Sequence, residues 1–450
     1  MKQLYTKYKP HYRDNLSLAI PVVISQLGHM LVQTSDSVII GHFAGTTALA
    51  AVSLAGSVFM VILVTGLGIS YAITPLIAQA NGRKNYSECG QLLFNSLLIN
   101  LFTALVLFGV VYFGSRLALD NLNQAPEVIT LAKPFLLLLG VSIVPLMIFN
   151  TFKQFAEGLG FTKQAMKISI WGNLLNIFLG IIFVKGMFGI TPMGVRGVGY
   201  STLIDRCVMA TVMSLYVLRS ARFKVYLKDF ALRSFSRVRS WQLLRLGAPV
   251  AMQYTFEISA FAGANILIGT ISAVDQAAHQ VAISLASITY MMASGLSSAA
   301  AIKSGNNFGA KNFAGLRLSA ISSYHIVLGF MSVTALIFMF GNHILPWIYT
   351  SDQQVIQVAA QLLILAAIFQ LFDGAQVVGL GILRGMGDVN YPTLITFLAY
   401  WVLGLPFGYW LGFHLHLGAI GVWCGLVLGL GVASLLLFAR FQVISKRISL

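Results

Sequence analysis

Long apolar segments alternate with short polar stretches along almost the whole chain. A transmembrane helix needs about 20 predominantly apolar residues, and these segments reach or exceed that length. They are too long for the strands of a membrane β-barrel, and the alternation of such strands is absent. The pattern predicts an all-α polytopic membrane protein with twelve transmembrane helices, at residues 15–41, 47–78, 91–115, 127–150, 166–189, 195–218, 243–270, 276–303, 315–341, 354–383, 389–415 and 418–442.

Seven prolines lie within these spans or at their ends. Each removes a backbone hydrogen bond and can bend its helix. They are Pro21, Pro75, Pro134, Pro145, Pro249, Pro392 and Pro406.

Residues 219–245 divide the chain into two blocks of six spans. This stretch carries eight Lys and Arg residues and a single acid, Asp229, in a chain that is otherwise mostly apolar. We interpret it as a cytoplasmic bridge. The expected organisation is an N-terminal six-helix lobe at 1–218, a basic linker at 219–245 and a C-terminal six-helix lobe at 246–450.

The charge of the loops predicts the orientation. With the N-terminus placed inside, the inner segments carry 24 Lys and Arg residues and the outer loops carry four. Inner loops of membrane proteins are enriched in Lys and Arg, so both chain ends are expected in the cytoplasm, with the protein in a bacterial inner membrane. The net charge of +16 then indicates contact with anionic lipid rather than with nucleic acid.

The two blocks repeat each other at an offset of 224 to 228 residues. Each repeat has an even number of spans, so both halves have the same orientation. This predicts two bundles related by a pseudo-twofold axis along the membrane normal, with a cavity between them. A channel could share that symmetry, so the repeat alone does not identify a transporter. The matching segments are 19–21 with 247–249, 40–41 with 268–269, 81–85 with 308–312, 157–160 with 384–387, and 194–197 with 418–421.

The composition and the absence of known motifs exclude several classes of protein. The chain is 57% hydrophobic and 9% charged, with a mean hydropathy of +0.82, whereas soluble domains contain roughly 25% charged residues. Cys89, Cys207 and Cys424 have no metal-binding or redox spacing. Nucleotide-binding, zinc-hydrolase and serine-hydrolase motifs are absent, and the eight His residues form no tight cluster, so no cofactor and no enzymatic activity are predicted.

Four acids fall inside predicted spans: Asp36, Asp205, Glu257 and Asp373. A carboxylate in hydrocarbon is costly and normally faces a cavity, a partner or an ion. Asp205 is followed by Arg206, which favours a structural role for this pair. The other three acids have no adjacent base. We interpret them as functional, with hydrogen bonding between helices as the alternative.

Glu257 and Asp373 are expected at the same depth. Glu257 is 12 residues past Arg245, and Asp373 is 11 residues before Arg384. At ~1.5 Å per residue, both lie roughly 17 Å from the inner surface, near the membrane midplane. Burial disfavours the charged form of a carboxyl, and two neighbouring carboxylates disfavour double ionisation. Such a pair can take up a proton near neutral pH, or hold Na⁺ or a cationic ligand instead, and competition among these occupants is a basis for antiport.

In the first half, Asp36 is the acid around which a second site is expected. Asn173, Asn176 and Thr202 could supply further oxygens for a hard cation such as Na⁺, although asparagines also join membrane helices by hydrogen bonds. Flat hydrophobic cations could meet aromatic and Met side chains, because ring faces attract cations and Met re-packs around varied ligands. Met252, Tyr290, Met291 and Met292 are the candidates, with core packing as the plainer interpretation.

These residues resemble the multidrug and toxic compound extrusion (MATE) family, and its NorM-type branch in particular. The resemblance covers nearly the whole chain. It rests on Pro21 with the run 36–41, on their counterpart in the seventh span, on the turns at 157–160 and 384–387, and on Glu257 with Asp373. It implies two six-helix lobes around a V-shaped cavity, through which organic cations leave in exchange for Na⁺ or H⁺.

The resemblance also implies roles for single residues. Glu257 and Asp373 match the second-lobe cation site of the family, and Asp36, Asn176 and Thr202 match its first-lobe cation site. Tyr290 and Asp352 match positions implicated in drug or ion contacts. Two positions depart from the family pattern. Gly180 stands where relatives often carry an acid, which weakens the expectation of Na⁺ in the first lobe, and Phe369 replaces a tyrosine of some relatives.

We therefore expect a secondary active multidrug efflux antiporter that exports hydrophobic organic cations in exchange for Na⁺ or H⁺, acting as a monomer. A lipid-linked precursor flippase is the alternative, but it would need a basic cavity; a membrane enzyme would need a nucleophile or metal cluster. The cation-coupling candidates are Glu257, Asp373, Asp36, Asn176 and Thr202, of which the three acids are candidate Na⁺ ligands. The substrate-binding candidates are Tyr290, Asp352, Met252, Met292 and Phe369.

Overall fold

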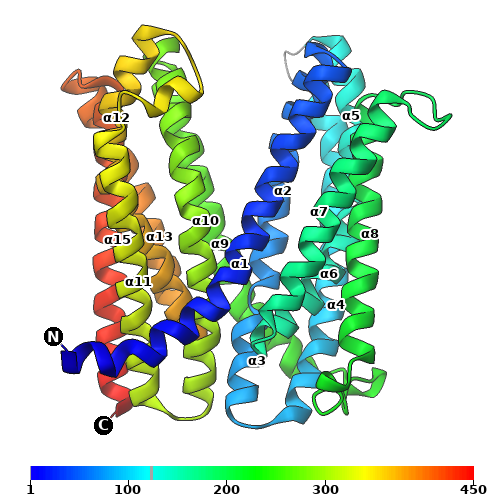
Figure 1. Ribbon diagram of the computed structural model, residues 1–450, viewed down its shortest axis with the longest axis vertical. Coiled ribbons are helices and arrows are strands. Elements are labelled where there is room, and N and C mark those ends of the chain that lie inside the picture. The colour runs from blue at the N-terminus through cyan, green and yellow to red at the C-terminus, as the bar shows by residue number, and fades with distance from the viewer. Residues whose placement is uncertain (1, 122–124, 450) are drawn as a thin grey trace. The chain divides into compact units, whose positions relative to one another are not determined.

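The computed structural model describes residues 2–121 and 125–449, and this part of the chain is helical, without strands (Figure 1). The first half contains α1 (Lys2–Phe43), α2 (Thr46–Ser70), α3 (Ile73–Gly82), α4 (Tyr86–Asn121), α5 (Pro126–Val141), α6 (Ile143–Gly158), α7 (Thr162–Lys185) and α8 (Val195–Arg219). The second half contains α9 (Arg237–Gly269), α10 (Ala273–Gly309), α11 (Phe313–Phe340), α12 (Gln353–Gly385), α13 (Asn390–Phe397), α14 (Leu405–Tyr409) and α15 (Gly418–Ser449). Short 3₁₀ turns η1 (Ala221–Phe223), η2 (Leu232–Ser234) and η3 (Leu345–Ile348), and π-helical segments η4 (Leu398–Gly404) and η5 (Trp410–His414), complete the described chain.

These elements form twelve spans in the expected order. In the described ranges, eleven are long and apolar enough to cross a membrane, with α2–α3, α5–α6 and α13–η5 each counted as one. The twelfth span is α9, which is more polar because it carries Gln253, Glu257 and Asn265. The all-α class predicted from the sequence is thus confirmed, and the most polar span is one that carries a candidate acid.

Two of the predicted spans are broken where prolines interrupt the backbone hydrogen bonds. Helix α2 ends at Ser70 and α3 begins at Ile73; α5 ends at Val141 and α6 begins at Ile143. A proline cannot donate to the carbonyl four residues earlier. For Pro75 that carbonyl belongs to Tyr71, and for Pro145 it belongs to Val141. Both helix breaks therefore lie at the carbonyl groups that have lost their hydrogen bond to a proline.

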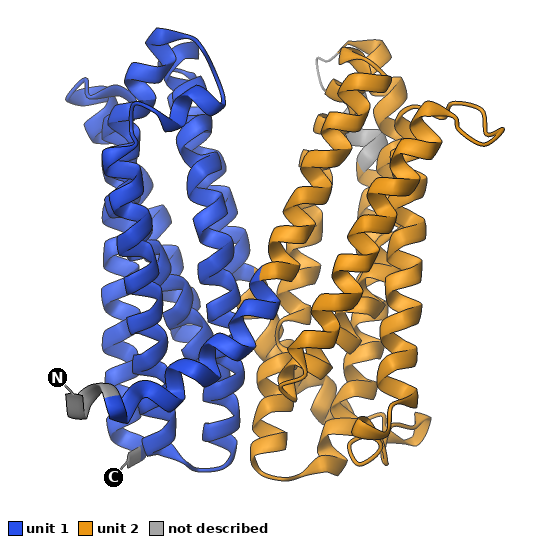
Figure 2. Cartoon of the chain, in the orientation of Figure 1, with its two compact units in different colours: residues 1–23, 252–450 blue, residues 24–251 orange. Residues whose placement is uncertain are grey.

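The chain forms two compact units (Figure 2). Unit 1 contains the N-terminal segment through Val23 and residues 252–450, and unit 2 contains residues 24–251. The first part of α1 belongs to unit 1 because Asn15, fully buried, donates to the carbonyl of Ser319 at 3.0 Å and to Oγ of Ser322 at 2.8 Å. Whether the lobes begin and end at the limits expected from the sequence stays a prediction.

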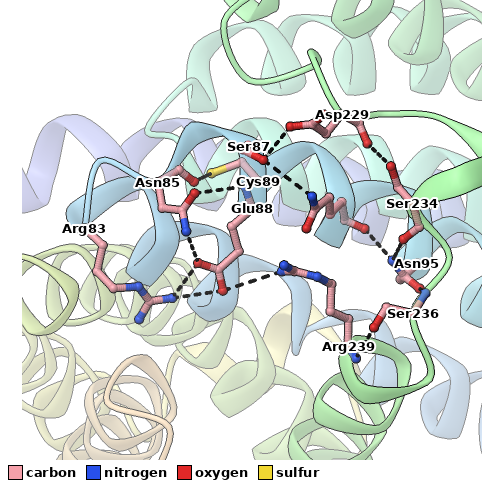
Figure 3. A network of polar contacts seen from close by, with 11 residues as sticks. Arg83, Asn85, Ser87, Glu88, Cys89, Asn95, Asp229, Ser234, Ser236 and Arg239 are labelled. Carbon is pink, nitrogen blue, oxygen red and sulfur yellow. Dashed lines mark hydrogen bonds and ion pairs between the residues drawn. The ribbon is translucent and has the colours of Figure 1, made fainter.

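The basic linker is fastened to unit 2. Phe223 is completely buried, and its ring meets those of Phe161 and Tyr216, with centroids 5.1 and 5.4 Å apart. The Oδ1 atom of Asn95 accepts from the backbone nitrogen of Ser236 at 2.9 Å (Figure 3). The linker is therefore an ordered part of the unit rather than a free tether.

Ion pairs hold the same region. Glu88, near the start of α4, lies 3.2 Å from Arg83 and 3.8 Å from Arg239 at the start of α9 (Figure 3). Exposed ion pairs contribute little each, but a shared acid between two bases also fixes positions. One carboxylate thus joins the α3–α4 turn to the end of the linker.

Small residues bring the last two spans of unit 1 into backbone contact. A Cβ added at Gly425 would lie 2.4 Å from the Gly404 oxygen and 2.4 Å from the Gly408 Cα. Small residues at four-residue spacing allow such close approach between membrane helices. The two runs are Gly404, Gly408 and Gly412 on the eleventh span, and Gly421, Gly425 and Gly429 on α15.

We expect Gly425→Ala to destabilise unit 1, because the added methyl meets backbone that cannot rotate away. Overpacking of this kind costs about 1–3 kcal/mol. The apparent melting temperature of the detergent-purified protein should fall by several degrees. Gly329→Ala is the matched control, since a Cβ at Gly329 meets nothing within 4 Å. Equal melting temperatures for the two variants would contradict the close packing.

Candidate functional site

Glu257 and Asp373 lie in the interior of unit 1. Their residues are 6% and 3% exposed, on α9 and α12. Glu257 lies close enough to act electrostatically on Asp373. In the described ranges neither has an ion-pair partner within 4.0 Å. The structure thus brings together the two acids that the sequence placed at one depth.

A narrow pocket opens beside Glu257. Its free volume of about 10 Å³ is enough for about one water molecule or a bare cation. Tyr290 of α10, a substrate-binding candidate, forms part of its wall. The lining residues are Gln253, Tyr254, Glu257, Tyr290, Ser297, Val377, Leu380 and Arg384, and we refer to them as the unit 1 pocket.

Helical periodicity explains how this pocket forms. On α9, Gln253 and Glu257 are four residues apart and therefore share a face. On α12, Asp373 lies four residues before Val377 and eleven before Arg384, so it is on the same helix face as these two pocket residues, although it is not itself part of the lining. The acids are positioned by the regular repeat of two helices rather than by loops.

Arg384 supplies positive charge at one end of the unit 1 pocket. Its guanidinium lies over the Tyr254 ring, 5.6 Å from the centroid, and it acts electrostatically on Glu257. A cation over an aromatic face is attracted by the ring. Arg384 is thus held by Tyr254 at the pocket wall, near Glu257 but beyond ion-pair distance in the described structure.

Neutral polar side chains surround Asp373, and sequence reasoning missed them. Gln370 and Gln376 stand three residues before and after it and are fully buried. The Tyr400 hydroxyl donates to Oε1 of Gln376 at 2.8 Å, and the Thr334 hydroxyl donates to Oε1 of Gln370 at 3.0 Å. Both amide nitrogens are buried without a partner. The signal available was the three-residue spacing of Gln, Asp and Gln within an apolar span.

The first-half candidates meet in unit 2. Asp36 lies on α1, Asn176 on α7 and Thr202 on α8. Nδ2 of Asn176 donates to Oγ1 of Thr202 at 3.3 Å. The Oδ1 atoms of Asp36 and Asn176 are buried and have no hydrogen-bond partner. Asp205, interpreted from the sequence as structural, acts electrostatically on Asp36. We call Asp36, Asn176, Thr202 and Asp205 the unit 2 cluster.

Four substrate-binding candidates lie outside the lining of the unit 1 pocket. Asp352 is exposed and caps α12, accepting from the Gln354 nitrogen at 2.9 Å. It is 21 residues before Asp373 on one helix, which is about 30 Å. Phe369 is buried against Phe261 and Trp423, with ring centroids 5.9 and 5.4 Å apart. Met252 is 49% exposed on α9, and Met292 is partly buried on α10.

Comparison with known proteins identifies the family of the chain. The family model described as MatE matches residues 21–182 and again residues 249–410, which reproduces the internal repeat. The chain is 31% identical over 435 residues to a probable multidrug resistance protein NorM of Bacillus licheniformis, covering 97% of this chain and 96% of that protein. It is 33% identical over 450 residues to the multidrug resistance protein MdtK of Yersinia pseudotuberculosis, covering 98% and 97%.

The fold agrees as well. The crystal structure of MATE in the bent conformation superposes with a TM-score of 0.90 at 20% identity, over 100% of this chain and 98% of that one. The family match and the near full-length relatives define a multi-pass membrane transporter rather than an enzyme. The chain belongs to the MATE family of multidrug resistance transporters, as the sequence predicted.

We expect Phe369→Ala to act on stability, because the side chain fills a ring cluster rather than a binding surface. Removing a buried Phe costs about 3–5 kcal/mol. The melting temperature of the purified protein should fall clearly, whereas Met252→Ala, at a half-exposed position, should leave it nearly unchanged. A stable Phe369→Ala protein with lost drug binding would instead assign Phe369 to the substrate site.

Proposed function

We propose that this protein is a secondary active antiporter that exports hydrophobic organic cations in exchange for Na⁺ or H⁺. The observation that carries the proposal is the pair Glu257 and Asp373, buried together in unit 1 without an ion-pair partner in the described ranges. Two carboxylates in a low-dielectric interior favour an occupant that brings positive charge. A proton or Na⁺ meets that need, and so does an organic cation.

Exchange follows from competition for the same charge. An ion held by Glu257 and Asp373 lowers the affinity for a second cation nearby, and by linkage the second cation lowers the affinity for the ion. The transporter can therefore release the drug when the ion arrives. No nucleotide motif is needed for this cycle, because the ion gradient supplies the free energy.

The size of the unit 1 pocket bears on its occupant. About 10 Å³ admits a bare ion or a water, whereas drug-sized ligands need sites of ~300–1,000 Å³. We propose that this conformation suits the coupling ion and that the site for organic cations opens in another conformation. Tyr290, on the pocket wall, is the aromatic residue best placed to meet such a ligand, with Met252 and Met292 on the neighbouring stretches of α9 and α10.

Three further features support the proposal. Relatives over nearly the whole chain are named multidrug resistance proteins. The 24 inner and four outer Lys and Arg residues favour cytoplasmic chain ends in a bacterial inner membrane. Asp36, Asn176 and Thr202 form a second candidate cation site in unit 2. We propose that the protein works as a monomer in which Glu257, Asp373 and Asp36 are the ionisable ligands.

The test is transport of a cationic dye into inverted membrane vesicles under an imposed gradient. A sodium jump and a pH jump, applied separately, identify the coupling ion. The double variant Glu257→Gln, Asp373→Asn should lower gradient-driven transport at least tenfold, because neutral amides cannot hold the ion. Glu127→Gln, at an exposed acid, is the control.

Two results would count against the proposal. Wild-type rates in the double variant would remove the coupling role of these acids. Dye accumulation in wild-type vesicles that is unaffected by either gradient would remove the antiport mechanism itself.

A further inference from the structure

Asp205 is a buried acid that the proposed mechanism does not yet use. It lies on α8, its residue is 4% exposed, and its Oδ1 atom is buried without a hydrogen-bond partner. The adjacent Arg206 does not pair with it within 4.0 Å in the described structure. Arg206 instead donates to Oγ of Ser142 at 2.6 Å and lies over the Phe59 ring at 5.4 Å.

The packing of α7 against α8 places Asp205 opposite Asn176. The two helices run side by side and antiparallel (Figure 1). Each step of four residues forward along α7 corresponds to a step of four residues backward along α8. The two helices therefore keep one register along the whole contact. The facing pairs are Gly172 with Met209, Asn176 with Asp205, Gly180 with Ser201, and Val184 with Gly197.

Three oxygen atoms of the unit 2 cluster lack donors. They are Oδ1 of Asp36, Oδ1 of Asn176 and Oδ1 of Asp205, from three different helices, and all are buried without a partner. Buried polar atoms almost always have a hydrogen-bond partner. While the two acids are ionised, these three oxygen atoms can accept hydrogen bonds but cannot donate them. The Asn176 side chain forms a hydrogen bond with Asp205, but the three oxygens named above have no partner, and a group of such oxygens is suited to a cation, either a metal ion or a proton.

The charge of the surroundings favours a monovalent ion. Asp205 acts electrostatically on Asp36, and Arg206 acts on both acids. Two negative charges and one positive charge leave a net charge of −1. One Na⁺ or one proton neutralises it, whereas a divalent ion would leave an excess positive charge in the interior of the unit.

A glycine keeps the space that the Asp205 carboxylate occupies. A Cβ at Gly172 would lie 2.6 Å from Oδ1 of Asp205 and 2.5 Å from Met209. A larger residue at position 172 would therefore push the carboxylate away from its place opposite Asn176. By contrast, a Cβ at Gly180 has its nearest neighbours at 3.5 and 3.6 Å, which is ordinary van der Waals contact.

We propose that Asp205 is a direct ligand, with Asp36 and Asn176, of a monovalent cation bound inside unit 2. The inference rests on the proposed antiport function and adds a second acid to its unit 2 site. Asp36 and Asp205 serve one ion, so removing either acid removes most of the binding. Arg206 sets the net charge, and Thr202 orients Asn176 through the hydrogen bond to its hydroxyl.

The test measures equilibrium binding of ²²Na⁺ to the purified full-length protein in the Glu257→Gln, Asp373→Asn background, so that the remaining binding reports unit 2. Proton binding is followed in the same variants by potentiometric titration across neutral pH, which separates a sodium site from a proton site. Asp205→Asn and Asp36→Asn should each weaken binding of one of the two ions at least tenfold. The double variant should bind no more weakly than the weaker single variant.

Position 180 supplies the complementary variant. A carboxylate introduced by Gly180→Asp stands one helical turn from Asn176, and together with Asp205→Asn it should restore part of the lost binding at unchanged melting temperature. Binding by Asp205→Asn equal to that of Glu127→Gln would overturn the proposal, as would multiplied losses in the Asp36, Asp205 double variant. This experiment measures ion binding, whereas the vesicle experiment measures transport. A failure of vesicle transport would refute the antiport mechanism and would leave the proposed role of Asp205 in ion binding intact.

Discussion

An ionised carboxylate inside a membrane bundle needs a positive charge beside it. An acid at the centre of a membrane helix costs about 2.5–3.5 kcal/mol on insertion scales, and a second carboxylate nearby raises that cost. The described structure offers Glu257 and Asp373 no ion-pair partner, although Arg384 stands at the pocket wall. The bound ion that we propose therefore supplies the positive charge that these two carboxylates need, and the surrounding helices leave space for it.

The two units use one scaffold for two differently built sites. Repeated matches to the same family model show the common origin of the halves. In unit 1, Glu257 shares a small pocket with two tyrosines and an arginine, and glutamines flank Asp373 along α12. In unit 2, Asn176 stands beside Asp205, and Arg206 reduces the net negative charge of the two acids. Each site therefore combines two acids with one arginine, and the two sites differ in the neutral polar side chains around those charges.

Much of the architecture could be predicted from the sequence, because a bilayer imposes a simple length rule on apolar segments. The residues at which helices begin and end were harder to predict. Helix α1 begins at Lys2, well before the predicted span at residue 15, since hydropathy marks the bilayer and not the end of a helix. The broken spans follow from Pro75 and Pro145, whose effect on the hydrogen bonds was foreseeable.

The candidate acids could also be recognised, because charges in apolar spans are rare. The residues that lie beside these acids in the structure could not be predicted. Asp205 seemed to be neutralised by Arg206, yet consecutive residues on a helix do not face each other, and Arg206 points to Ser142 and Phe59. Asn176 meets Asp205 only because of the register between α7 and α8, which no local pattern specifies. Tyr400 reaches Gln376 from a π-helical segment for the same kind of reason.

Ion release on drug binding tests the central claim most directly. Purified protein, loaded with Na⁺ or equilibrated at fixed pH in weak buffer, is mixed with a cationic substrate while free Na⁺ and pH are recorded. If buried carboxylates hold an exchangeable cation, binding of the substrate should release Na⁺ or protons in proportion to the substrate bound. Tight substrate binding without any release, and with an affinity independent of both pH and Na⁺, would contradict the account.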